Sequence, residues 1–233
     1  MEFKRARSDE QRNERRLQIL RTAAEMLAEM PVAKITLNEL SRRVGLAKSN
    51  VLRYFESREA VLLELLDAEA QDWLAHLDRA LEAGGGTPRQ RGDRLAAILA
   101  ESLAQRPALC DLTNAHASVL EHNVSAEVAL RHKRATRATY ETQSQLILRC
   151  LPELGSHDAT QLAATATLIT AAAWPYSRPP EALLAAYAAD PELATMRLDF
   201  TDLLRQTLAV TISGLLARRH NPPVDEATMT AES

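Results

Sequence analysis

Several scarcities narrow the class of protein that this sequence can encode. Only two cysteines occur in 233 residues, Cys110 and Cys150, which excludes a disulfide framework and is typical of a reducing, cytoplasmic compartment. Glycine occurs 7 times against 40 alanines, a balance that favours helices. No apolar run approaches the ~18–20 residues of a membrane helix, and the charged N-terminus predicts no secretory signal, so we expect no membrane contact.

The short motifs of common catalytic and nucleotide-binding sites are also missing. The chain contains no G-x-x-x-x-G-K-[ST], G-x-G-x-x-G, H-E-x-x-H or G-x-S-x-G pattern. The run Gly84-Gly85-Gly86 predicts a break between two helices. It is not a phosphate-binding loop, because no lysine completes that motif after it. We therefore expect neither an enzyme nor a cofactor.

A loose group of metal-binding residue types lies between residues 110 and 132, namely Cys110, His116, Glu121, His122 and His132. His116 and His122 are six residues apart, which places them on different faces of an α-helix, and no C-x-x-C is present. The spacing thus predicts no metal site. A redox role for Cys110 has no support from a lowered pKa.

Charge divides the chain unevenly. Residues 1–62 hold 13 Lys+Arg and 9 Asp+Glu, a balance of +4, whereas residues 63–233 hold 15 and 22, a balance of −7. A basic head on an acidic body suggests that the head meets a polyanion. Chance variation together with a solvated N-terminal arm is the alternative explanation.

Apolar residues recur at helical spacing, and no stretch shows sustained apolar/polar alternation or a hairpin signal. The pattern therefore predicts an all-α fold. Prolines between Pro175 and Pro180 exclude a helix through that whole stretch, and we expect a disordered tail after residue 220. The expected helices span residues 9–29, 37–44, 48–55, 58–83, 90–105, 108–121, 126–151, 158–174, 181–189 and 199–219.

Two of the expected helices, 37–44 and 48–55, flank a tight turn. Thr36 and Glu39 have the spacing of a capping box, and Gly45 suits a left-handed helix end. A small core is expected from Leu40, Val44, Leu46, Val51 and Phe55. This spacing predicts a helix-turn-helix.

The second helix of this pair leaves five side chains for contact with DNA: Lys48, Ser49, Asn50, Arg53 and Tyr54. Arginine can pair with guanine, asparagine with adenine and serine with either base in the major groove. Lys48, Tyr54, Arg58 and the free N–H groups after Thr36 and Ser57 suit phosphates. The alternative is a helical ligand-binding or protein-interaction module in which the helix pair only supports the fold.

Residues 36–66, TLNELSRRVGLAKSNVLRYFESREAVLLELL, resemble the N-terminal signature of the TetR-type repressor family. The resemblance implies a helix-turn-helix head at residues 1–62 and a helical ligand-binding and dimerisation body at 63–220. Its implied phosphate contacts are Thr36, Tyr54 and Arg58, and its implied groove contacts are Lys48, Ser49, Asn50 and Arg53. The sequence departs from the signature at Ala47, where a serine cap is common, and at Leu52, where an aromatic residue is common. A basic arm with Lys4, Arg5 and Arg7 is a further candidate for the minor groove.

The resemblance also implies a homodimer that binds a double-stranded, inverted-repeat operator and is released by a small-molecule effector. We expect the last two long helices to form the dimer interface through Ala163, Thr167, Leu204, Leu208, Thr211 and Leu215. The expected residues of the effector pocket are Trp73, His116, Tyr140, Gln143 and Trp174. Burial within one chain is the alternative for both sets.

Overall fold

The computed structural model describes residues 2–81 and 84–220, and helices joined by turns and loops are the only regular secondary structure in this part of the chain. The all-α prediction is thus confirmed. None of the described helices is both long and apolar enough to cross a membrane. In chain order the elements are α1 (Glu2–Glu29), η1 (Val32–Lys34), α2 (Leu37–Val44), α3 (Lys48–Val51), α4 (Arg58–Ala80), α5 (Pro88–Ala104), α6 (Pro107–Ala115), the π-helical turn η2 (His116–Leu120), α7 (Ala126–Cys150), η3 (Pro152–Leu154), α8 (Gly155–Tyr176), α9 (Glu181–Ala189), α10 (Pro191–Ala194) and α11 (Phe200–His220).

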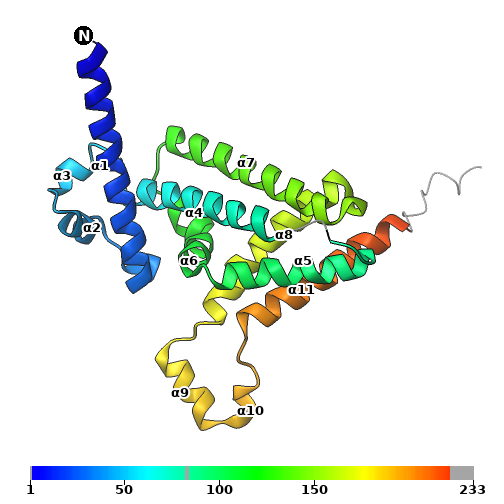
Figure 1. The fold of residues 1–233 in the computed structure, drawn as a ribbon. Helices are drawn as coiled ribbons and strands as arrows, with labels where there is room; N and C mark the ends of the chain where they lie inside the picture. The colour runs from blue at the N-terminus through cyan, green and yellow to red at the C-terminus, as the bar shows by residue number, and fades with distance from the viewer. Residues whose placement is uncertain (1, 82–83, 221–233) are drawn as a thin grey trace, which may run out of the picture.

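The helices form a small head and a larger body that share α4 (Figure 1). In the head, α1 packs against α2 and against the start of α4. In the body, α7 packs on α4 and α8, and α11 lies along α5 and α8. The helix α4 therefore connects the head to the body.

One apolar core runs through the head and the body. Its members are spaced at helical intervals that place them on the inner face of each helix, as expected for packed amphipathic helices. Fully buried examples are Ile19 in α1, Leu62 and Leu77 in α4, Leu99 in α5 and Leu112 in α6. The segment α9–α10 is different, because it projects from the body and contains no buried residue (Figure 1).

Several predicted helix ends differ from the structure. The first helix begins at Glu2 instead of Asp9, because residues 2–8 contain no Gly or Pro and are mostly good helix formers. The predicted arm is therefore part of α1, and the side chains of Lys4, Arg5 and Arg7 lie outside the described ones. The predicted disordered tail, 221–233, also lies outside the described residues. As predicted, the stretch after Pro175 is not helical throughout, since α8 ends at Tyr176.

Candidate functional site

The turn between α2 and α3 has the geometry that its sequence predicts. Thr36 Oγ1 accepts a hydrogen bond from the Glu39 N–H at 3.1 Å, and Gly45 is left-handed at φ 73° and ψ 29°. The predicted capping box is only half present. The carboxylate of Glu39 does not return to the cap, because it bonds to Arg42 and Arg43, and these hydrogen bonds lower the pKa of Glu39 to about 2.

The second helix of the helix-turn-helix, α3, is called the recognition helix below, and it is shorter than predicted. It ends at Val51, and a turn carries the chain to Phe55, whose N–H still bonds to the Val51 carbonyl at 3.1 Å. Ala47 supplies no side-chain acceptor at the N-cap, which is consistent with a short helix. Val51 and Phe55 are buried and anchor the helix to the head. Lys48, Ser49 and Asn50 are exposed on its outer face.

Arg53 and Tyr54 border a groove between the recognition segment and α1. The groove has a volume of about 1040 Å³ and is lined by Gln11, Arg12, Glu14, Arg15, Gln18, Arg21, Arg53 and Tyr54. Its lining contains four arginines and one acidic residue, so its charge suits a polyanion. Arg12, Arg15 and Arg21 were not among the residues predicted for the site, although their position on the polar face of the first helix was a usable signal.

Two residues proposed for phosphate contact have different surroundings. Thr36 is exposed at the start of α2. Arg58 is only 19% exposed, and its Nη1 donates to the Ile35 carbonyl at 2.9 Å while Nε donates to Glu59 Oε1 at 2.9 Å. These bonds fix the segment before α2 to α4. The described contacts of Arg58 are therefore internal, and its contact with phosphate stays a prediction.

The body contains a small cavity between α4, α6, α7 and α8, with a volume of about 80 Å³. Four of the five residues predicted for the pocket line it, namely Trp73, His116, Tyr140 and Gln143. Its apolar lining comes from Leu66, Ala70, Leu103, Leu109 and Ala166. The prediction for Trp174 is corrected, because this residue lines a separate surface hollow and packs edge-on against Phe200 at 5.1 Å.

Two polar side chains reach this cavity without a hydrogen-bond partner among the residues that the structure describes. Gln143 is 1% exposed, and neither its Nε2 nor its Oε1 has a hydrogen bond. Thr170 is 2% exposed, and its hydroxyl is also unpaired. By contrast, Trp73 Nε1 donates to Ser102 Oγ at 3.0 Å and is satisfied. The cavity thus offers hydrogen bonds from one amide and one hydroxyl.

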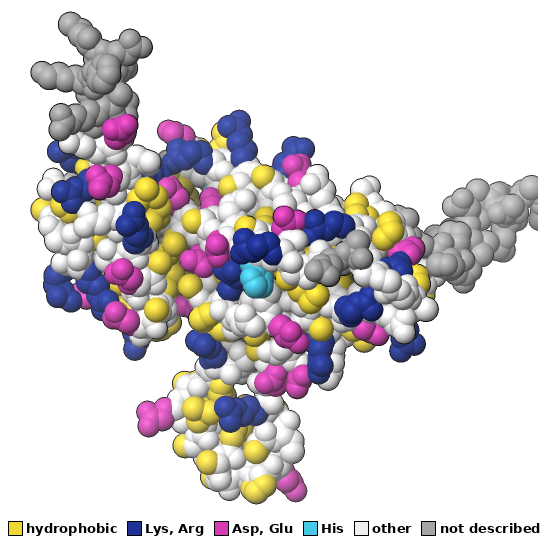
Figure 2. Space-filling model, viewed as in Figure 1, with side chains coloured by type: hydrophobic (Ala, Val, Ile, Leu, Met, Phe, Trp, Pro, Cys, Tyr) yellow, Lys and Arg dark blue, Asp and Glu magenta, His cyan; other side chains and the backbone are white. Residues whose placement is uncertain are grey.

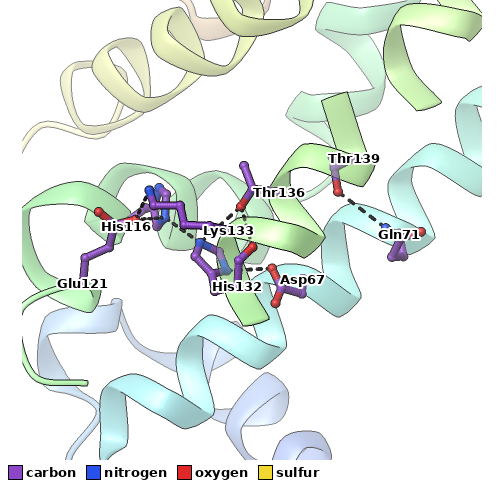
Figure 3. A network of polar contacts seen from close by, with 8 residues as sticks. All are labelled: Asp67, Gln71, His116, Glu121, His132, Lys133, Thr136 and Thr139. Atoms are coloured by element: carbon purple, nitrogen blue, oxygen red, sulfur yellow. Dashed lines mark hydrogen bonds and ion pairs between the residues drawn. The ribbon is translucent and has the colours of Figure 1, made fainter. Parts of the chain in front are cut away.

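At one end of the cavity, side chains from α4, η2 and α7 form a polar network (Figure 3). His132 Nδ1 lies 2.8 Å from Asp67 Oδ1, and His132 Nε2 lies 2.6 Å from His116 Nε2. Glu121 Oε1 lies 2.9 Å from the same His116 nitrogen and also pairs with Lys133. Burial and the neighbouring His132 lower the pKa of His116.

The structure brings together His116, Glu121 and His132, which spacing along an α-helix over residues 108–121 does not predict. The π turn instead joins the Glu121 N–H to the His116 carbonyl at 3.3 Å, and the two side chains meet. Asp67, which lies 65 positions before His132, was missed because nothing local marks the pairing.

The predicted dimer face is corrected for most of its residues. Ala163, Leu204 and Leu208 are 0% exposed within a single chain, and Leu215 is 8% exposed, so none of them is free to contact a partner. Thr167 lines the cavity. The same two helices expose Leu168 at 70% and Val210 at 72%. Yellow apolar side chains also gather on the projecting α9–α10 segment (Figure 2).

The head therefore has the architecture of a helix-turn-helix DNA-binding protein. Residues 19–65 match the family model of bacterial regulatory proteins of the tetR family, and residues 67–219 match that of the tetracyclin repressor-like C-terminal domain. The chain belongs to the TetR family. This is a family of DNA-binding transcriptional regulators and not of enzymes, so the assignment favours a DNA-binding role for the helix-turn-helix over a purely structural one.

Curated relatives match over part of their length. The HTH-type transcriptional regulator EthR of Mycobacterium tuberculosis is 32% identical over 126 residues, which cover 54% of this chain and 47% of the relative. The nucleoid occlusion factor SlmA of a Marinomonas species is 26% identical over 106 residues, 46% of this chain and 53% of the relative. The matched region thus spans about half the length of these proteins.

Solved structures share the fold at low identity. FadR of Bacillus subtilis, determined in complex with stearoyl-CoA, superposes with a TM-score of 0.53 at 13% identity and covers 85% of this chain and 98% of its own. A TetR/AcrR-family regulator of Thermobifida fusca gives 0.51 at 22% identity, with 86% and 98% covered. Both comparisons establish the fold alone.

Proposed function

We propose that this regulator is a homodimeric repressor that binds an inverted-repeat operator and leaves it when a small, mostly apolar effector enters the cavity. The observation that carries this proposal is the unpartnered amide of Gln143 in a cavity whose walls also contain apolar side chains such as Leu66 and Leu109. A buried polar group without a partner costs about 1–3 kcal/mol, and a ligand that bonds to it recovers that cost. Apolar walls with a few polar groups are typical of ligand sites.

The size of the cavity supports a mechanism of release. Its volume of about 80 Å³ is below the ~300–1,000 Å³ of pockets for drug-sized ligands. An effector of that size therefore binds only when the surrounding helices have moved apart. A ligand that binds one conformation better than another shifts the population toward it, and that preference is the requirement for allosteric release.

The segment from His116 to Ser125 provides a route from the cavity to the head. It begins at the cavity wall with His116 and ends in two contacts with the head. Asn123 Nδ2 donates to Glu59 Oε2 at 3.1 Å, and the Ser125 N–H donates to Glu56 Oε1 at 2.5 Å. A widening of the cavity at His116 would strain these bonds and change the spacing of the two heads in a dimer.

For the dimer interface we propose the outer face of α8 and α11, which includes Leu168 and Val210. Large apolar side chains exposed at 70% and 72% are favourable to bury against a second copy. A two-fold dimer through these helices would present two recognition helices to the two halves of an inverted repeat.

The first test is footprinting of the chain on the DNA that flanks its own gene, followed by a thermal-shift screen for effectors. A protected inverted repeat and a ligand that both raises the melting temperature and releases the DNA are expected. Protection of a single half-site, or a stabilising ligand that leaves the DNA affinity unchanged, would contradict the proposal.

Gln143→Leu sharpens this test. It removes the unpaired amide, so we expect the ligand-free protein to become more stable and the effector to bind more weakly. The matched control is Gln145→Leu, which changes an exposed glutamine on the same helix. Equal effector affinity in the two variants would show that the Gln143 amide is not part of the effector site.

A further inference from the structure

We propose that His116, Glu121 and His132 form a binding site for one divalent transition-metal cation of the zinc class, with Asp67 as a positioning residue for His132. The proposal concerns an ion and not the effector, and it does not depend on release from DNA. Two imidazoles and one carboxylate are a ligand set that zinc accepts.

The three donor atoms already converge. One ligand atom from each of the three residues lies within 4.8 Å of the other two. Ligand bonds of ~2.0–2.1 Å place two nitrogens of a tetrahedral site about 3.3 Å apart, and the two Nε2 atoms now lie 2.6 Å apart. A movement of about 0.7 Å would make room for the ion. Rotation of His116, which is 21% exposed, is sufficient for such a movement.

The network has more hydrogen-bond acceptors than hydrogens to share among them, and a cation would satisfy the acceptors that remain. His132 Nδ1 faces a carboxylate, and a hydrogen on this nitrogen leaves Nε2 of a neutral ring with a lone pair that is directed at His116. His116 Nε2 faces both that lone pair and the carboxylate of Glu121. One proton on His116 thus serves two acceptors. A divalent cation in its place would bind all three groups at once.

The fixed contact of Asp67 with His132 is itself characteristic of metal sites. A ligating histidine usually donates its other ring nitrogen to a carboxylate or carbonyl, which sets the tautomer and the ring orientation. Here Asp67 on α4 lies 2.8 Å from His132 Nδ1, the nitrogen that does not face the cluster (Figure 3). The ion would therefore join α4, η2 and α7.

The π turn supports the same assignment. It places Glu121 beside His116, a pairing that an α-helix would not allow, and π-helical turns occur frequently at functional sites. Three protein ligands leave a fourth position for water. His116, His132 and Thr136 also line the cavity, so this fourth position is expected on the cavity side.

Lys133 is the one cation that competes for this site among the contacts described. Its Nζ pairs with Glu121, but the side chain is 58% exposed and free to move into solvent. An ion at the three ligands would displace it. We therefore expect Lys133→Gln to increase the affinity for the metal, an effect opposite in sign to that of the ligand variants.

The test is titration of the chelator-treated full chain with Zn²⁺ by calorimetry and with Co²⁺ by visible absorption. One ion per chain is expected, with the intense Co²⁺ bands of tetrahedral coordination. His116→Gln and His132→Gln should abolish these bands, and Asp67→Asn should weaken binding by about 10–100-fold. The exposed His122→Gln is the matched control and should bind like the wild type.

Circular dichroism of each variant tests its fold, and Glu121→Gln provides a ligand variant at a site that is 30% exposed. Loss of the Co²⁺ bands in this folded variant supports the site. Absence of one-to-one binding in the wild type, or equal binding by the double variant His116→Gln/His132→Gln, overturns it. No arm of the experiment contains DNA or an effector, so the proposed function is tested separately.

Discussion

The head and the body differ in their buried polar groups, because those without a hydrogen-bond partner among the described residues all lie in the body. In the head, helix-starting hydroxyls bond to backbone N–H groups, as Thr36 does to Glu39 and Ser57 to Ala60, both at 3.1 Å. The recognition residues Lys48, Ser49 and Asn50 face solvent. In the body, Gln143 and Thr170 are buried with unpaired polar atoms.

This difference suits the head to the recognition of DNA bases and the body to a change of conformation when a ligand binds. A head with satisfied polar groups has one preferred arrangement, which suits the fixed spacing of bases in a groove. Buried groups without partners cost about 1–3 kcal/mol each, so a conformation of the body that satisfied them would be favoured by a similar amount for each group. We infer that specificity resides in the head and responsiveness in the body.

The largest expected effect comes from a variant that tests whether the head binds its operator when the bodies of two chains cannot form a dimer. The double variant Leu168→Glu/Val210→Glu places charge on the proposed dimer face. We expect a monomer by light scattering and operator affinity lower by about 10³-fold or more, since specific complexes exceed non-specific ones by at least that factor. The control is Leu130→Glu, which alters an apolar side chain 51% exposed on α7. A double variant that remains dimeric would place the interface elsewhere.

The next prediction compares two residues of the recognition segment, Arg53 and Lys48, on specific and non-specific DNA. Arg53→Ala should reduce discrimination between the operator and a scrambled site by roughly 1–3 kcal/mol, the value of one bidentate base contact. Lys48→Ala should weaken both complexes equally and reduce the salt slope by about 1 if its role is a phosphate contact. Fluorescence anisotropy at several salt concentrations measures both quantities. Equal losses on both DNAs for Arg53→Ala would assign this arginine to the backbone.

The same division explains what the sequence could predict. Signals in the head are local, since Thr36, Gly45 and Ser57 each mark a helix end within three or four residues of their partners. The helix-turn-helix and its exposed residues were therefore predictable. The end of α3 was placed too late, because the N–H groups of Arg53 and Tyr54 bond to carbonyls three residues back, a turn that apolar spacing does not distinguish from an α-helix.

In the body the informative contacts are distant in sequence. Asp67 and His132 meet across 65 positions, and the π turn that pairs His116 with Glu121 has no clear sequence signal. Helix periodicity predicted that Leu204 and Leu208 are buried but not what buries them. A wide apolar face serves an internal core or a partner equally well, and only the packing of α11 on α5 and α8 decides between the two.

A smaller perturbation tests the rigidity of the head. Gly45 is left-handed, and a Cβ atom there would meet no neighbour within 4 Å. Gly45→Ala therefore isolates the conformational cost, about 1–2 kcal/mol for an L-residue in this region. We expect a lower melting temperature with no new clash, measured by calorimetry. Gly214→Ala, also without a neighbour within 4 Å but on α11, is the control and should not lower it. A Gly45→Ala variant as stable as the wild type would refute the constraint.

The smallest expected effect concerns the protonation of the body. Burial, with His132 and Lys133 nearby, lowers the pKa of His116, while Glu121 and Asp67 oppose this shift. The folded chain then binds a proton at His116 less readily than the unfolded chain, whose value is near 6.5. Stability is therefore full above that pH and decreases as the pH falls through 6.5 toward the lower folded value.

Denaturant unfolding between pH 7.5 and 3.5 in the presence of a chelator measures this effect, over a range that includes the reference pKa values of histidine and of glutamate. His116→Gln should flatten the dependence, whereas the exposed His122→Gln should retain it. The lowered pKa of Glu121 acts in a separate window, since its contribution to stability is lost only below 4.5. A dependence confined to that lower window would assign the acid sensitivity of the body to its carboxylates and not to the imidazole pair.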